Sequence, residues 1–139
     1  MKEDRPPDPP PRILPPLDEV NRAFWTGGKD GELLILWCET CGRWVHPPAA
    51  GCPAGHEGLE PRAVSGEGRV FTYTVNHHPF HPAVPPPYVV AIVELAEQAD
   101  LRLIANIVGC PPEEVSIGMG VRVAFEEHGE AFVPIFEPA

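Results

Sequence analysis

The sequence predicts a mainly β protein, in which a short N-terminal helix precedes a small metal-binding ribbon and a five-stranded barrel. Three observations support this fold class. Cysteine and histidine cluster between positions 38 and 56, the chain after position 66 is rich in β-branched and aromatic residues, and only one short segment has helical periodicity. With 139 residues and 43% hydrophobic content, the chain can form one ordinary domain, or two very small ones, with a packed core.

Proline dominates residues 1–16, which contain seven of the chain's 20 prolines. This composition predicts an extended, polyproline-like flexible arm that has no core of its own. The arm is either a solvated tail, the remnant of a linker from a longer chain, or a segment that lies along a partner. The N-terminus lacks the apolar stretch of a signal peptide, and no apolar run reaches the length of a membrane span. We therefore expect a cytoplasmic protein that does not enter the membrane.

Residues 17–31 are expected to form the helix and the turn that ends it. Three apolar residues share one face of a helix over residues 17–25, namely Leu17, Val20 and Phe24. Two acidic residues, Asp18 and Glu19, lie in the first turn, where the helix dipole favours anions. The segment "TGGKDG" then ends the helix. A short helix with one apolar stripe must pack against its own domain or against a partner.

Residues 32–65 have the pattern of a zinc ribbon, in which two short loops each donate two metal ligands. The spacing is Cys38-x2-Cys41-x10-Cys52-x3-His56. The strand-like segments "ELLILW" and "RWVHPP" flank the first cysteine pair and place it at the tip of a hairpin. Reduced cysteines at this spacing have little other use in a reducing compartment, so we predict a structural Zn²⁺ site.

The fourth ligand of this site does not follow from the cysteine spacing. A second pair with the same spacing as the first would need a cysteine at position 55, where the chain has Gly55. His56 is the nearest donor and the preferred ligand, with His46 or water as alternatives. A competing interpretation is a decayed site with three free cysteines. The remaining cysteine, Cys110, lies far along the chain, and we expect a small buried residue there rather than a nucleophile.

Residues 66–139 contain the strands of the predicted barrel. The β-rich segments are "GRVFTYTVNHH", "YVVAIVEL", "LRLIANIVG" and "GMGVRVAFEEHGEAFVPIFEP", the last with a hairpin turn at His128 and Gly129. The segment "CPPEEVSIG" allows only one helical turn, with Pro112 near its start. Five strands with one short helical insert between the third and the fourth fit a small closed barrel, for which the OB-fold is the natural candidate.

The charge balance argues against one common function of such barrels. The chain has a formal net charge of −10, and residues 66–139 carry three Lys or Arg against ten Asp or Glu. Binding to phosphate backbones depends on clustered Lys and Arg. We therefore expect no general nucleic-acid binding, although a stand-alone OB-fold nucleic-acid binder remains an alternative hypothesis, which a filter-binding assay at low salt would test.

Taken together, these motifs resemble a known family. The helix ending in "FW", the run L-x4-C-x2-CG-x4-PP, the "CP" that follows, and the barrel segments "SGEGRVFTYTVNHHPF", "PYVVAIVEL" and "IGMGVRVAFE…PIFEP" are similar to the zinc-ribbon/OB-fold family of acyl-CoA-associated proteins, long described as a domain of unknown function. The resemblance covers about residues 17–138. The chain departs from the family's four-cysteine pattern at Gly55.

The resemblance implies a rubredoxin-like zinc ribbon joined to an OB barrel, acting as a subunit beside a thiolase-superfamily protein. Known settings are archaeal thiolase complexes and actinobacterial steroid side-chain pathways. In the latter, such a domain, often fused behind a hydratase domain, pairs with a lipid-transfer-protein-like aldolase that cleaves a steroid side-chain CoA thioester. We expect a non-catalytic subunit in a hetero-oligomer, with a CoA thioester as the ligand of the complex. A free acyl-CoA-binding protein or thioesterase is a further alternative.

Two groups of residues are candidates for contacts in such a complex. Where the first barrel strand runs into the proline loop, Tyr73, His77 and His78 are candidates for lining a substrate channel, with His81 close by, although solvated histidines on a loop are the alternative. The partner interface is expected to involve the helix and the ribbon, with three aromatic candidates: Phe24, Trp25 and Trp44. Trp25, Trp37 and Trp44 would otherwise cover the metal.

Overall fold

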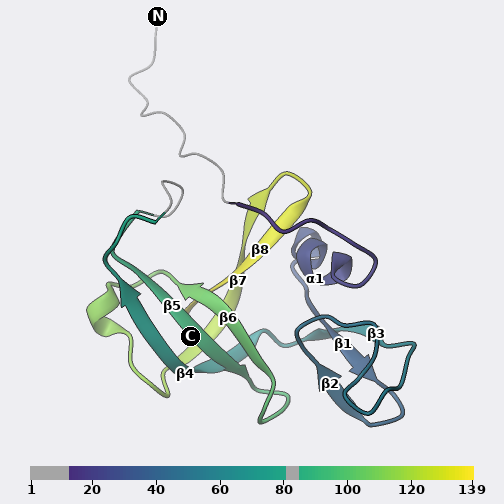
Figure 1. Cartoon of the computed structure of the whole chain (residues 1–139). Coiled ribbons are helices and arrows are strands. Elements are labelled where there is room, and N and C mark those ends of the chain that lie inside the picture. Colours follow the sequence, from purple (N-terminus) through teal and green to yellow (C-terminus); the bar gives the residue numbers. More distant parts are fainter. Residues whose placement is uncertain (1–12, 81–84) are drawn as a thin grey trace, which may run out of the picture.

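The computed structural model describes residues 13–80 and 85–139 of the chain. Most of the predicted arm and His81 lie outside this range. Figure 1 shows a ribbon unit on one side, a barrel on the other and a short helix above their junction. The elements in chain order are α1 (Arg22–Thr26), the 3₁₀ helix η1 (Gly27–Asp30), β1 (Leu33–Cys38), β2 (Arg43–Val45), β3 (Glu60–Val64), β4 (Glu67–Asn76), β5 (Tyr88–Leu95), β6 (Arg102–Ile107), the 3₁₀ helix η2 (Pro112–Glu114), β7 (Gly120–His128) and β8 (Ala131–Pro138).

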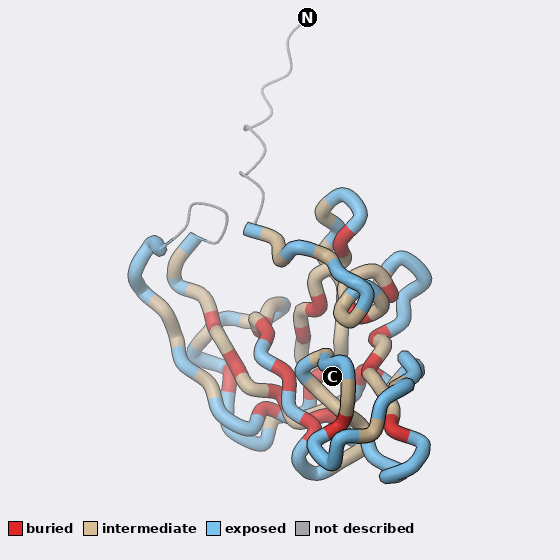
Figure 2. Tube along the Cα trace, turned by 45° about the vertical axis from the view of Figure 1, so that its right-hand side comes forward, coloured by how far each residue is buried: buried red, intermediate tan, exposed pale blue. Residues whose placement is uncertain are grey.

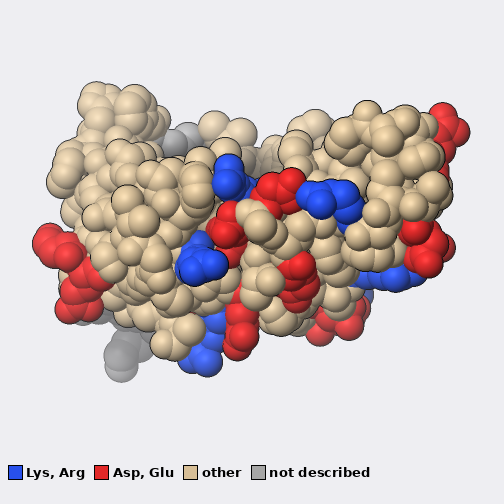
Figure 3. Space-filling model, turned by 90° about the horizontal axis from the view of Figure 1, so that it is seen from below, with Lys and Arg blue, Asp and Glu red and all other residues tan. Residues whose placement is uncertain are grey.

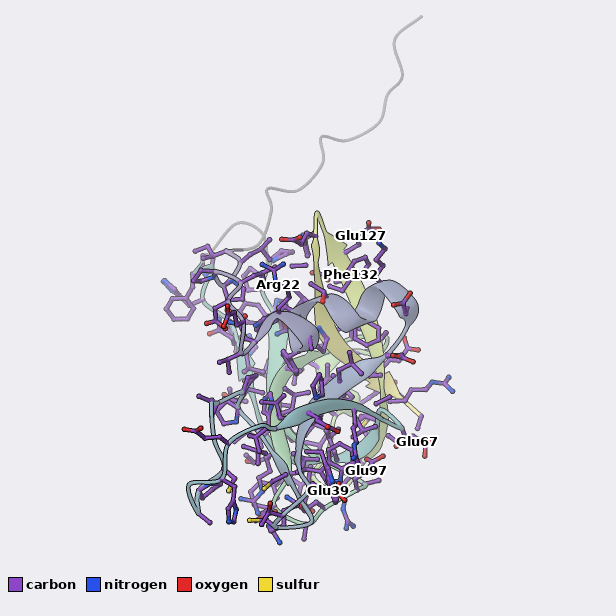
Figure 4. The ribbon with its side chains drawn as sticks, turned by 90° about the vertical axis from the view of Figure 1, so that its right-hand side faces the viewer. Arg22, Glu39, Glu67, Glu97, Glu127 and Phe132 are labelled. Carbon is purple, nitrogen blue, oxygen red and sulfur yellow. The ribbon has the colours of Figure 1, made fainter. Side chains whose placement is uncertain are left out.

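The helix α1 is shorter than the sequence predicted, and residues 19–21 before it form a turn. The Asp18 carboxylate accepts hydrogen bonds from the backbone N–H groups of Val20 and Asn21, both at 2.8 Å. The Asp18 carbonyl also accepts the Arg22 N–H at 3.1 Å, so Asp18 caps a single turn ahead of α1. The predicted turn is the 3₁₀ helix η1, in which Gly28 approaches the β7–β8 hairpin so closely that a Cβ atom would lie 2.5 Å from the Cβ of Phe132. Figure 4 shows Phe132 and Arg22 where the helix meets this hairpin.

The ribbon is a three-stranded antiparallel sheet in the order β2-β1-β3. The pairing of β1 with β2 includes Trp37 opposite Trp44, whose rings lie 4.9 Å apart. The third strand, β3, was not predicted. The inward side chains of β1, Leu33 and Ile35, are each 1% exposed and belong to the same buried cluster as the barrel core. The ribbon and the barrel therefore share apolar packing.

The barrel has the strand order β4-β5-β6-β8-β7 and closes between β7 and β4, as predicted for an OB-fold. Burial alternates strictly along β5, so every second side chain points into the core. Figure 2 shows these buried positions repeating along the barrel strands. The residues at the centre are almost inaccessible: Val70, Val93, Val121 and Phe136. Between β6 and β8 the closure is narrow, with a single parallel pair, Ile107 opposite Phe136.

Polar contacts fix the ribbon against the β5–β6 turn of the barrel. The Gln98 side chain bonds both backbone groups of Trp44, as a neighbouring β-strand would. Its Oε1 accepts the Trp44 N–H at 2.9 Å, and its Nε2 donates to the Trp44 carbonyl at 3.2 Å. Arg43 pairs with Asp100 at 2.7 Å beside this contact. The Glu97 carboxylate accepts the Ser65 N–H at 2.7 Å. These contacts orient the ribbon on the barrel. No helix among the described residues is long and apolar enough to cross a membrane.

Candidate metal centre and apolar groove

Two tight turns bring the predicted metal ligands together. In the β1–β2 hairpin, the Gly42 N–H donates to the Cys38 carbonyl at 2.8 Å, and the Cys41 N–H points at the Cys38 sulfur at 3.4 Å. The second turn repeats this arrangement, with the His56 N–H 3.4 Å from the Cys52 sulfur. The spacing of two residues in one pair and three in the other therefore produces two knuckles that face each other.

The four donor atoms have a geometry suited to a tetrahedral ion. They all lie within 4.8 Å of one another. The Nδ1 atom of His56 is 3.8 Å from the sulfur of Cys38, 3.1 Å from that of Cys41 and 3.3 Å from that of Cys52, and the sulfurs of Cys41 and Cys52 are 3.7 Å apart. Tetrahedral zinc, with bonds of about 2.3 Å to sulfur and about 2.0 Å to nitrogen, separates its ligand atoms by about 3.5 to 3.8 Å. Three thiolates and one imidazole thus fit Zn²⁺ in both chemistry and spacing.

The backbone at position 55 is consistent with His56, rather than residue 55, as the fourth donor. Gly55 has φ +90°, a conformation that L side chains rarely adopt. A cysteine at position 55 would be strained in this turn. The alternative ligand, His46, is not among the grouped donor atoms, although it lines a pocket with Cys41 and Cys52 as well as a larger apolar groove. Among the described residues the arrangement favours His56.

The cysteines of the cluster differ in their acidity. Burial on its own raises the pKa of Cys52, but the backbone N–H groups of His56 and Ala54 and the neighbouring cysteine side chains outweigh it and bring the pKa to about 6. Cys41 behaves in the opposite way, because hydrogen bonding with Cys52, burial and the other cysteine raise its pKa to about 11. The backbone N–H groups around Cys52 therefore favour its thiolate form, the form that binds a metal ion.

An apolar groove of about 470 Å³ lies where the helix, the ribbon and the barrel meet. Its walls come from five segments: α1, the residues that follow β2, and strands β5, β6 and β8. Burial lowers the pKa of His46 in this groove to about 4, so the ring is neutral near pH 7, and its centroid lies 4.9 Å from that of Phe24. Arg102 is the single charged residue of the lining. This groove was not predicted, since its walls come from segments far apart in the sequence.

The predicted channel residues do not line this groove. Tyr73 lies on β4, partly buried against the barrel core. His77 and His78 are exposed just after β4, and the His78 ring lies 4.5 Å from that of Phe80. Their role in a substrate channel stays a prediction.

The predicted interface residues lie on both sides of the helix–ribbon junction. Phe24 is 5% exposed and belongs to the core that the ribbon and the barrel share, so it lies beneath the predicted interface rather than on its surface. Trp25 is half-buried on the groove wall, 4.8 Å from the Phe24 ring. Trp44 is half-buried and held by Gln98. The sequence did not single out Gln98 or Arg102, since nothing in their local pattern marks a contact.

Cys110 is partly buried rather than fully buried as expected. It packs against the barrel core, and burial, followed by the charge of Glu114, raises the pKa of its thiol. A raised pKa reduces the thiolate population that a nucleophile needs.

Two family models match this chain. One describes the rubredoxin-like zinc ribbon domain of ChsH2 and matches residues 25–58, and the other describes the C-terminal OB-fold domain of ChsH2 and matches residues 61–126. Among solved structures, the chain is similar to one described as "Ltp2-ChsH2(DUF35) aldolase", with 40% identity, a TM-score of 0.78, and coverage of 90% of this chain and 98% of that one. A DUF35 protein of unknown function from Sulfolobus solfataricus, 16% identical with a TM-score of 0.63 and matched over 87% of this chain and 86% of its own, shares the fold.

Two relatives with described roles are much longer than this chain, and a third is of similar length. A "probable enoyl-CoA hydratase alpha subunit" of Thermomonospora curvata is 41% identical over 93% of this chain, and the "3-oxo-4,17-pregnadiene-20-carboxyl-CoA hydratase alpha subunit" of Mycobacterium tuberculosis is 32% identical over 94%. The chain spans only 41% and 42% of the length of these two proteins. A "DUF35 domain-containing scaffold protein" of Methanocaldococcus jannaschii is 41% identical, with 78% of both chains covered. The chain therefore belongs to the DUF35 family and carries its zinc ribbon and OB-fold domains.

Proposed function

We propose that this chain is an accessory subunit that binds a thiolase-fold partner, either an aldolase or a thiolase, and helps to form the acyl-CoA channel of the complex. The observation that carries the proposal is the likeness to the DUF35 chain of the Ltp2-ChsH2 aldolase, which extends over 98% of that chain. The names of the relatives, scaffold protein and alpha subunit, describe proteins that work in assemblies. In this role the chain is non-catalytic by itself.

More specifically, we propose that the complex with the partner catalyses the retro-aldol cleavage of a steroid side-chain CoA thioester. It is supported by the name of the M. tuberculosis relative, a hydratase subunit for a pregnadiene carboxyl-CoA. CoA is anionic, and this chain has a net charge of −10. Figure 3 shows acidic and basic side chains interleaved on one face, with no large basic patch there. The partner would therefore supply the basic contacts to the CoA phosphates.

Within the subunit, Zn²⁺ held by Cys38, Cys41, Cys52 and His56 would stabilise the ribbon, whose sheet is too small to bury a core of its own. Zinc closed in by four protein ligands serves a structural purpose. For the channel, we propose Tyr73, His77 and His78, and for the partner interface, Trp25 and Trp44 above the buried Phe24. The exposure of His77 and His78 leaves both rings accessible to a partner.

The test is co-expression with thiolase-fold proteins of the same genome, beginning with any that is encoded beside the gene of this chain. We expect a stable complex in size-exclusion chromatography at micromolar concentration, and cleavage of a steroid side-chain CoA thioester by the complex only. Separate elution of the two chains would contradict the accessory role. Turnover of CoA thioesters by the isolated chain, in a free-thiol assay, would indicate a thioesterase instead.

A further inference from the structure

We propose that the outer edge of β6 and the groove beside it receive an extended apolar segment of the thiolase-fold partner as an added β-strand. The inference rests on the proposed function, because it assigns the surface through which the subunit holds that partner.

The first observation is an unpaired strand edge. Strand β6 pairs with β5 along its whole length, from Arg102 to Ile107, but pairs with β8 only at Ile107. Within the described part of the chain, the stretch 102–106 therefore has a strand neighbour on one side only. In antiparallel pairs, the backbone N–H and C=O groups of alternate residues point away from the partner strand. Such an edge is a template for another strand.

The second observation is that an apolar groove runs along this edge. Five consecutive residues of β6, 102–106, line the groove, opposite Trp25 of α1 and the Pro47–Pro48 segment. Ile104, in the middle of the stretch, is 71% exposed although it is a large aliphatic residue, and it pairs across the sheet with Ile92. An incoming strand would thus gain backbone hydrogen bonds on one side and apolar contacts on the other.

The charges of the groove indicate what kind of segment fits. The lining contains no Asp or Glu, although the chain has 20 of them, and its single charged residue is Arg102. The Arg102 guanidinium lies 3.8 Å from the centroid of the Phe71 ring and bonds Glu94 at 3.5 Å. A segment with aliphatic side chains would bury no charge against this lining, whereas a charged segment would be desolvated there with Arg102, already bonded to Glu94, as the one charged residue of the lining.

Two other occupants fit less well. The chain's own residues 1–16 contain seven prolines, which lack the N–H group that strand pairing needs. A second copy of the chain would bring together two molecules of net charge −10. The neighbouring subunit is the occupant that these observations favour.

The experiment uses two matched variants of the full chain. Ile104→Asp places a carboxylate in the groove, and Ile117→Asp is the control, because Ile117 is 69% exposed and lies outside the groove lining, in the loop before β7. Both positions are exposed, so both variants should fold, which circular dichroism checks. Affinity for the thiolase-fold partner identified by co-expression is measured by isothermal titration calorimetry. We expect Ile104→Asp to weaken binding by about tenfold or more and Ile117→Asp to leave it unchanged.

Hydrogen exchange tests the strand addition itself. In the complex with the wild-type chain, the amides of residues 102–106 should gain protection. Equal affinity of Ile104→Asp and wild type, or no added protection at these amides, overturns the inference while leaving the accessory role intact. Protection of the same amides in the isolated chain, with a dimer in light scattering, assigns the edge to a second copy and also overturns it. If the wild-type chain does not bind, the proposed function fails, and this inference fails with it.

Discussion

Acidification should destabilise this protein through His46. Burial in the groove lowers the pKa of this residue from 6.5 to about 4. The Phe24 ring lies 4.9 Å from the His46 ring between centroids, and Arg102 is the single charged residue lining the groove. His46 also lines a smaller pocket whose charged residues are Arg43 and Asp100. Protonation would place a cation in these surroundings, so the folded state resists it and the unfolded state does not.

The sign and size follow from linkage. Because the folded-state pKa is depressed, the unfolded chain binds more protons between pH 4 and pH 6.5, and the free energy of unfolding falls as the pH falls through this range. A shift of about 2.5 units corresponds to an upper limit of about 3 kcal/mol. Between about pH 7.5 and about pH 5, the expected loss is about 2 kcal/mol.

The assay compares the wild type with His46→Phe, which retains a ring against Phe24 and removes the titrating group. Urea denaturation, followed by tryptophan fluorescence, gives the free energy of unfolding across this pH range. Protonation of the metal ligands at low pH lowers the free energy of unfolding of both proteins, so the difference between the two pH profiles isolates the contribution of His46. We expect the variant to lose about 2 kcal/mol less than the wild type. Parallel profiles would refute the account of a buried neutral imidazole.

Two further predictions concern the metal and the core. Cys38→Ser removes one of four ligands, so it should lower the zinc content well below about one equivalent in elemental analysis and disorder the hairpin while much of the barrel persists. The control variant, Cys110→Ser, should keep its metal. A full equivalent of zinc in Cys38→Ser would contradict the ligand assignment. Phe136→Ala should reduce the free energy of unfolding by about 3 to 5 kcal/mol in urea titrations, because Phe136 is fully buried at the barrel centre. The same change at Phe80, which is 71% exposed, should cost less than about 0.5 kcal/mol, and similar losses at both positions would contradict this placement of the core.

Much of the fold could be predicted because its signals are local. Strand β5, Tyr88–Leu95, has the bounds that its sequence pattern predicted, since alternating burial and β-branched residues act within the strand itself. The two ligand turns follow from cysteine spacing in the same way. The helix is shorter than its apolar periodicity predicted: α1 begins at Arg22, and Asp18 caps a single turn before it. Strand β3 was missed because its residues are largely exposed.

The sequence by itself determined the zinc-ribbon and barrel architecture, the four candidate ligands and the family, because these depend on spacing and periodicity within short segments. Tertiary structure alone decided that His46 lines a groove rather than the metal centre, and that one edge of β6 is left without a neighbour. The physical reason is that both features depend on how the ribbon docks on the barrel, through contacts such as Gln98 with Trp44 that join residues 54 positions apart.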